Sequence, residues 1–212
     1  MSTKDHQSEP IESASETLQR IFDGHGSVLG SQMADESSRY DVLKKTDFPK
    51  PQRTRRIAVA NQKGGVGKTT STVNTAAALA NKGAQVLVID MDPQGNASTA
   101  LGVSHASGEP SVYDVIEGRS DLGDVITVCP DFPTLDVVPA SIDLSGAELE
   151  VADLPNRNTL LKEALDLYLR QSDKHYDYLF IDCPPSLGLL VINAMCAVTE
   201  MLIPIQAEYY AL

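Results

Sequence analysis

The chain has 212 residues, which is enough for one α/β domain with a substantial core and an additional segment. Its hydrophobic content of 42% is ordinary for a globular protein, and no apolar run reaches the roughly 18 residues of a membrane-spanning helix. The polar, acidic N-terminal sequence excludes a secretory signal and a transit peptide. We therefore expect a cytosolic protein that does not act at a membrane.

The formal net charge of −12 is unevenly distributed. Residues 1–56 contain nine acidic and nine basic residues, whereas residues 57–212 contain twenty acidic and eight basic ones. Contacts to nucleic-acid phosphates need clustered Lys and Arg, so the second part gives no charge signal of DNA binding. The three cysteines, Cys129, Cys183 and Cys196, lack C-x-x-C spacing, and we expect them to be small buried residues.

Residues 1–55 are predicted to be a polar, disordered tail that ends in a linker. Large apolar side chains do not recur there with a helical or strand period, although Leu18, Ile21 and Phe22 could form one or two amphipathic turns. Residues 44–56 are basic and contain prolines, which is typical of an extended linker. A globular domain is predicted over residues 56–212.

In that domain, strand patterns and helix patterns alternate. The predicted strands are residues 56–61, 84–92, 125–129, 135–140, 176–185 and 201–206. The predicted helices are residues 68–83, 111–118, 158–171 and 187–198. This alternation predicts a doubly wound α/β fold, in which helices cover both faces of a mostly parallel sheet. No helix pattern follows the last strand, so we expect the domain to be truncated at its C-terminus.

Between the first strand and the first helix lies the segment "ANQKGGVGKTT", residues 60–70. It ends like a phosphate-binding loop, G-x-x-x-x-G-K-[ST], but has Gln62 in place of the first glycine and a second lysine, Lys63. Glycines in this context allow the backbone to approach a phosphate, and the amides that follow can surround an anion at the helix N-terminus. The predicted nucleotide-binding residues here are Gly64, Gly65, Val66, Gly67, Lys68, Thr69 and Thr70.

The chemistry of the loop assigns separate roles to its last residues. The Lys68 ammonium is predicted to reach the β- and γ-phosphates, and the Thr69 hydroxyl is predicted to bind Mg²⁺. Two later strands end in carboxylates, at Asp90 and Asp92 and at Asp182. Ligands bind at the carboxyl ends of the strands in open parallel sheets, so we expect these acids to gather around the same nucleotide. Thr69, Asp90 and Asp182 are the predicted metal ligands, and Asp92 could orient the attacking water.

The segments "KGGVGKTT", "VLVIDMDPQGNAS" and "LFIDCPPSLG", in this order, resemble the ParA/Soj family of partition ATPases, part of the deviant Walker A group that also contains MinD. The resemblance runs from Arg56 to Leu212. It implies that Lys63 reaches across an ATP-sandwich dimer to the nucleotide of the other subunit. It also implies that Asp92 acts on the water and that residues 184–188 form a switch, with Pro184 among the nucleotide-binding residues.

The resemblance further implies an Mg²⁺-dependent ATPase with weak intrinsic turnover, which binds ATP or ADP and acts as a nucleotide-controlled homodimer switch in chromosome or plasmid partition. A ParB-type centromere-binding protein would stimulate it. Its ATP-bound dimer would bind double-stranded DNA without sequence preference, with contact residues beyond Leu212. We accordingly expect a cytoplasmic, nucleoid-associated protein whose catalytic residues are Lys63, Lys68 and Asp92.

Three alternatives remain open from the sequence. A MinD-like positioning ATPase acting on a membrane would need a basic amphipathic helix at its C-terminus, which this sequence does not show. An iron–sulfur carrier or reductase built on the same loop would need cysteines at a dimer axis or in C-x-x-C pairs. A binding module without turnover would keep the loop and lack hydrolysis.

Overall fold

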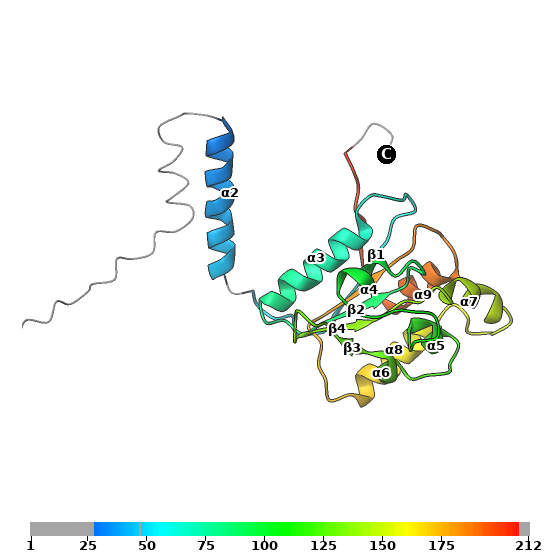
Figure 1. Ribbon diagram of the computed structural model, residues 1–212. Coiled ribbons are helices and arrows are strands. Elements are labelled where there is room, and N and C mark those ends of the chain that lie inside the picture. The colour runs from blue at the N-terminus through cyan, green and yellow to red at the C-terminus, as the bar shows by residue number, and fades with distance from the viewer. Residues whose placement is uncertain (1–27, 47, 208–212) are drawn as a thin grey trace, which may run out of the picture. The chain divides into compact units, whose positions relative to one another are not determined.

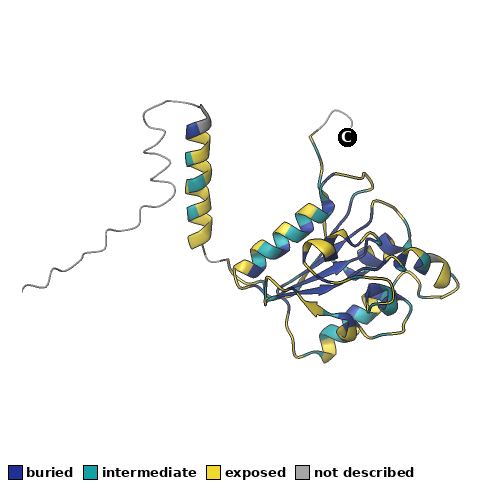
Figure 2. Ribbon diagram, viewed as in Figure 1, coloured by how far each residue is buried: buried dark blue, intermediate teal, exposed yellow. Residues whose placement is uncertain are grey.

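The computed structural model describes residues 28–46 and 48–207 of the chain, which separates into two units, residues 1–48 and residues 49–212. The described part of the first unit contains helix α2, Val28–Lys45 (Figure 1). This helix differs from the disordered tail that the sequence predicted. Most of its side chains are exposed (Figure 2), and the partly buried Ala34, Ser37 and Asp41 lie on one face without forming an apolar stripe that a sequence pattern could reveal. The suggested turns at Leu18, Ile21 and Phe22 lie outside the described residues.

The second unit is an α/β domain with a six-stranded sheet. Its strands are β1 Arg55–Val59, β2 Val86–Asp90, β3 Thr127–Val128, β4 Leu135–Val138, β5 Tyr178–Asp182 and β6 Glu200–Leu202. Its described helices are α3 Lys68–Asn81, α4 Asn96–Ala100, α5 Val112–Ile116, α6 Leu122–Val125, α7 Leu144–Glu150, α8 Leu160–Gln171 and α9 Leu189–Ala197. Every predicted strand and helix of this domain is present, and α4, α6 and α7 are additional.

The strand order is β3-β4-β2-β5-β1-β6. All neighbouring strands are parallel except β3, which pairs antiparallel with β4 at one edge. The predicted doubly wound, mostly parallel sheet is therefore confirmed. In this order β5 lies between β1 and β2, although it follows them by many residues, so the carboxyl ends of three predicted site segments become neighbours.

Helices cover both faces of the sheet (Figure 1). Alternate strand residues point to opposite faces, and in β2 the side chains of Val86 and Val88 pack in one core while those of Leu87 and Ile89 pack in the other. The first core is closed by Ala76 and other residues of α3, and the second by α5, α6, α7, α8 and α9. Figure 2 shows the strands between these layers as the most buried part of the domain.

The segment that includes β6 is less covered. Met201, Ile203 and Ile205 have exposed fractions of 48%, 54% and 62%. Among the described residues, no helix is both long enough and apolar enough to span a bilayer.

Candidate nucleotide-binding site

The predicted site residues come together at the carboxyl ends of β1, β2 and β5. Asp90 and Asp182 occupy paired positions at the ends of β2 and β5, and Val59 at the end of β1 pairs with Asp182 from the other side. The glycine loop begins directly after β1 and leads into α3. This is the edge at which ligands bind in open α/β sheets, so the topology places the loop and the acids at one site.

The glycine loop has the backbone that a phosphate-binding loop needs. Gly65 and Gly67 have φ angles of 75° and 91°, a left-handed conformation that glycine adopts without steric cost. Gly67 precedes α3, and no side chain caps the first turn of that helix. The Lys68 side chain folds back over the loop and donates a hydrogen bond of 3.2 Å to the Lys63 carbonyl oxygen. Helix amides and a buried ammonium group are thus directed to one place, which favours an anion.

Two side chains that the sequence analysis did not select hold the loop in shape. The Asn61 carboxamide accepts a hydrogen bond from the Lys63 amide at 2.9 Å and donates one to the Pro204 carbonyl at 2.9 Å. The Gln206 carboxamide donates to the Gly65 carbonyl at 3.0 Å. The residues that follow β6 therefore support the loop from the side. Asn61 could have been noticed as a polar residue at a strand end, but nothing in the sequence around Gln206 indicated a partner.

Asp182 lies directly beside Thr69. The Thr69 hydroxyl donates to one carboxylate oxygen at 2.7 Å, and the Thr72 hydroxyl, one turn along α3, donates to the other at 3.0 Å. Burial raises the pKa of Asp182 to about 6, with a further contribution from the charge of Asp90, while the hydrogen bond from Thr69 opposes the rise. A fully buried carboxylate of this kind is stabilised by a cation. A hydroxyl and a carboxylate are oxygen donors of the type that Mg²⁺ prefers, so this pair fits the metal that the sequence predicts.

The carboxylate of Asp90 is fully buried and bound by the protein itself. It accepts hydrogen bonds from the Ser98 amide at 2.8 Å, from the Ser98 hydroxyl at 2.7 Å and from the Asp92 amide at 3.1 Å. Burial raises the pKa of Asp90, and the bonds from Ser98 oppose that effect. Three donors from a single loop satisfy most of what this carboxylate can accept. These hydrogen bonds give Asp90 a structural role in this loop, and its metal ligation stays a prediction.

Asp92 begins a tight turn after β2. Its carbonyl oxygen accepts a hydrogen bond from the Gly95 amide at 2.8 Å, and its carboxylate accepts one from the Gln94 amide at 3.0 Å. The side chain is only 8% exposed. The neighbouring strand β5 ends at Asp182. Pro184, two residues later, is buried, and residues 185–187 form an exposed loop before α9. The predicted water-orienting residue and the predicted switch therefore follow adjacent strands.

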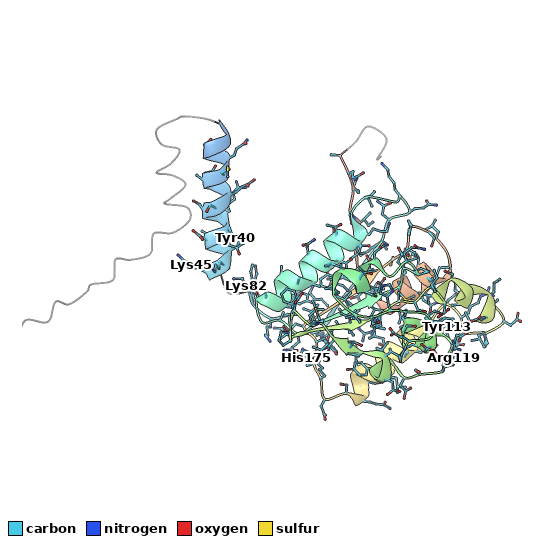
Figure 3. All side chains as sticks on the ribbon, in the orientation of Figure 1. Tyr40, Lys45, Lys82, Tyr113, Arg119 and His175 are labelled. Carbon is cyan, nitrogen blue, oxygen red and sulfur yellow. The ribbon has the colours of Figure 1, made fainter. Side chains whose placement is uncertain are left out.

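Of the three cysteines, Cys129 and Cys183 are buried as expected, whereas Cys196 is only partly buried. Burial raises the pKa of the Cys183 thiol to about 12, so it stays protonated and unreactive at neutral pH. His175 is largely exposed, 4.0 Å from Asp177 (Figure 3). The Arg119 guanidinium lies 4.6 Å from the centre of the Tyr113 ring, a surface cation–π contact (Figure 3).

Comparison with known proteins identifies relatives of the whole second unit. A family model described as an AAA domain matches residues 54–212. The sporulation initiation inhibitor protein Soj of Bacillus subtilis (strain 168) is 50% identical over 156 residues, which cover 74% of this chain and 60% of Soj. The chromosome partitioning protein ParA of Caulobacter vibrioides (strain NA1000 / CB15N) is 46% identical, over 74% of this chain and 57% of ParA. The chain thus spans about 60% of the length of these curated relatives.

Solved structures with the same fold include proteins of different function. Cobyrinic acid a,c-diamide synthase from Mycobacterium smegmatis, with bound ATP analog and magnesium, has a TM-score of 0.68 and 39% identity, and the match covers 75% of this chain and 63% of the synthase. A putative plasmid partition protein from Borrelia burgdorferi B31 bound to AMPPNP has a TM-score of 0.65 and 28% identity, with 76% and 66% of the two chains covered. The fold alone does not decide among such functions; by name, the two curated relatives above are a sporulation initiation inhibitor and a chromosome partitioning protein.

Proposed function

Because the chain belongs to the ParA/Soj family of partition ATPases, we propose that it binds and hydrolyses ATP with Mg²⁺ and that the nucleotide controls a homodimer in chromosome or plasmid partition. The observation that carries this proposal is the hydrogen bond between Thr69 and Asp182, next to the buried Lys68 in a glycine loop. A hydroxyl and a strand-end carboxylate in this position are the usual holders of Mg²⁺ in phosphate loops. Thr69 and Asp182 would hold Mg²⁺, which would neutralise part of the phosphate charge.

The residues of the site position the reacting groups or supply positive charge. The loop amides and the start of α3 bind the phosphates, and Lys68 exchanges its contact with the Lys63 carbonyl for phosphate oxygens. Asp92, held in its turn by the Gln94 amide, orients the attacking water. Phosphoryl transfer depends mostly on alignment and charge stabilisation, so turnover stays slow until a partner completes the site.

Lys63 is the residue that we assign to the dimer. It lies in the exposed part of the loop, and its amide is fixed by Asn61. The protein carries a net charge of −12, so burying a triphosphate between two copies requires additional positive charge. A lysine from each subunit, directed to the nucleotide of the other, would supply it.

The relation to the partition ATPases extends the proposal to partners. A ParB-type centromere-binding protein would stimulate hydrolysis. The ATP-bound dimer would bind double-stranded DNA without sequence preference, and the protein would be cytoplasmic and associated with the nucleoid. The acidic domain described above offers no basic cluster for this contact. We therefore assign no DNA-binding residue among those described.

A DNA-binding experiment on the full-length protein tests the proposal. The Asp92→Ala variant is used to slow hydrolysis, and binding to non-specific duplex DNA is measured with ATP–Mg²⁺ and with ADP over a salt titration. We expect binding only with ATP, weakening as salt rises because counterions are released from the phosphates. Absence of binding in both states would refute the DNA switch, and co-sedimentation with anionic liposomes would then test the MinD-like alternative.

Nucleotide binding and turnover are tested separately by single substitutions. Lys68→Ala should weaken ATP binding by about 10- to 100-fold, because hydrogen bonds to charged groups contribute about 1.5–3 kcal/mol. Asp92→Ala should keep ATP affinity and retain only a residual, measurable turnover. Lys82→Ala, at the opposite end of α3, is the matched control and should change neither. Unchanged turnover in both Lys68→Ala and Asp92→Ala would show that the roles are wrongly assigned.

A further inference from the structure

The segment from Asp90 to Ser98 forms a closed loop that carries Asp92. It leaves the sheet at the end of β2 and returns in α4, which packs next to β2 (Figure 1). The loop is closed where the Ser98 amide and hydroxyl both donate to the same oxygen of the Asp90 carboxylate, at 2.8 and 2.7 Å. Both residues are fully buried, so these hydrogen bonds are shielded from competing water.

The backbone of Asp92 is hydrogen bonded to the same Asp90 carboxylate. The second oxygen of Asp90 accepts the Asp92 amide at 3.1 Å. On its other side Asp92 is held by the turn, through the Gly95 amide on its carbonyl and the Gln94 amide on its carboxylate. The position of the Asp92 carboxylate therefore depends on where the Asp90 carboxylate is held, and Asp90 is held by Ser98.

Ser98 also joins this loop to the next strand of the sheet. Its hydroxyl oxygen accepts a hydrogen bond from the Ala140 amide at 3.1 Å. Ala140 lies two residues beyond β4, in a stretch whose Pro139 carbonyl accepts the Val112 amide at 2.8 Å. The Ser98 hydroxyl is thus both donor and acceptor, and it connects the Asp92 turn with the segments that follow β4 and precede α5.

We propose that Ser98 is a positioning residue for hydrolysis, which acts through the Asp90 carboxylate to hold Asp92 where it orients the attacking water. The inference rests on the proposed function, since it assumes that Asp92 has this role. Asp90 then serves as the clamp of the loop, and the metal is left to Thr69 and Asp182. A displacement of about 1 Å in a group that aligns reactants can cost about 100-fold in rate, so a hydroxyl separated from the water by two residues can limit turnover.

Steady-state hydrolysis by the Ser98→Ala variant tests the inference. The variant loses the hydroxyl contacts to Asp90 and Ala140 and keeps the amide contact to Asp90. We expect kcat to fall about 10- to 100-fold, with KM and ATP affinity within about twofold, because the phosphate loop is untouched. Ser141→Ala is the matched control: Ser141 is equally buried, lies in the same segment after β4 and contacts Asp143 instead of Asp90. Ser98→Cys, which keeps the shape of the side chain but is slightly larger and a weaker donor, should lower kcat as well and replaces the alanine variant if that one does not fold.

A double-mutant comparison separates positioning from a general structural effect. Ser98→Ala added to Asp92→Ala should cause no further loss of turnover, since the residue it positions is gone. An equal further loss would overturn the positioning role, and so would a kcat of Ser98→Ala within twofold of the unmodified protein. Unchanged turnover in Asp92→Ala alone would overturn the proposed role of Asp92 and this inference with it.

Hydrogen exchange without nucleotide supplies a readout that does not depend on activity. Amides of residues 91–98 should exchange faster in Ser98→Ala than in the unmodified protein and in Ser141→Ala, while amides of α3 stay protected. Equal protection of residues 91–98 in all three proteins would overturn the inference.

Discussion

At the scale of single residues, the buried carboxylate of Asp182 makes the stability of the protein depend on pH. Its pKa is raised from 3.8 to about 6, chiefly by burial, so the folded protein binds this proton more tightly than the unfolded chain does. The resulting stabilisation is complete below the unfolded pKa and is lost as the pH rises through 6. With about 1.4 kcal/mol for each pKa unit, the loss amounts to roughly 3 kcal/mol.

We therefore expect Asp182→Asn to flatten the decline in the free energy of unfolding between pH 4 and pH 7. Urea unfolding of both proteins at several pH values, without Mg²⁺ or nucleotide, measures the two slopes. Comparing slopes is the suitable test because the raised pKa of Asp90 acts in the same direction in both proteins. Identical slopes would contradict the assignment to Asp182.

Gly64 offers a second test at this scale. A Cβ atom at this position would have no neighbour within 4 Å, and the backbone does not have a positive φ angle. We expect Gly64→Val to fold with an unchanged melting temperature and to bind ATP, but to block ATP-dependent dimerisation, since the added side chain would meet the partner where Lys63 reaches across. Analytical ultracentrifugation with ATP gives the answer, and Gly146→Val, in α7 where the backbone φ angle is also not positive, is the control for an added side chain. A dimer that survives Gly64→Val would refute the sandwich geometry.

The sequence predicted which residue types meet at the site, and it did not predict how they are held. The glycine loop and the strand-end acids carry fixed spacings along the chain, so Lys68, Thr69 and Asp182 could be assigned directly. The contacts of Asn61 with Pro204, of Gln206 with Gly65 and of Ser98 with Ala140 join distant segments, so no local pattern encodes them. The hydrogen bonds between Ser98 and Asp90 are local, but no sequence pattern indicated them.

At the scale of elements, the two faces of α8 are expected to contribute unequally to the free energy of unfolding. Leu165 is fully buried in the core below the sheet, whereas Leu167 on the same helix is 41% exposed. We expect Leu165→Ala to lower the free energy of unfolding by about 2–5 kcal/mol, the usual range for a cavity in a core, and Leu167→Ala to lower it by less than about 1 kcal/mol. Urea denaturation of the two variants measures both, and similar costs would show that α8 does not pack as described.

The periodic alternation of buried and exposed positions also explains which elements could be predicted from the sequence. In α8 and α3 the buried positions recur with a helical period, and in β2 and β5 the apolar runs have strand length, so these elements were recognised. The helices α4, α6 and α7 have five, four and seven residues, too few for a period to appear; α5 is equally short, but its apolar Val112, Val115 and Ile116 allowed it to be recognised. Helix α2 is long enough, but most of its side chains are exposed, and its composition matched that of a disordered segment.

At the scale of the whole molecule, the fold depends on pairings between distant parts of the chain. The strands β1 and β2 both pair with β5 and not with each other. The doubly wound architecture followed from the alternation of strands and helices, but the insertion of β5 between the first two strands could not be read from it. That insertion is what places the Asp182 carboxylate beside the glycine loop.

The central position of β5 also has a consequence for synthesis on the ribosome. Thr69 and Asp182, the two residues that hydrogen bond in the site, are 113 positions apart. At a translation rate of about 5–20 residues per second, β1 and α3 would wait roughly 6–23 seconds for their neighbour. During that interval the nascent chain has a glycine loop without its carboxylate and two strands without the partner that joins them, so neither the nucleotide site nor the centre of the sheet can form until most of the domain has been translated.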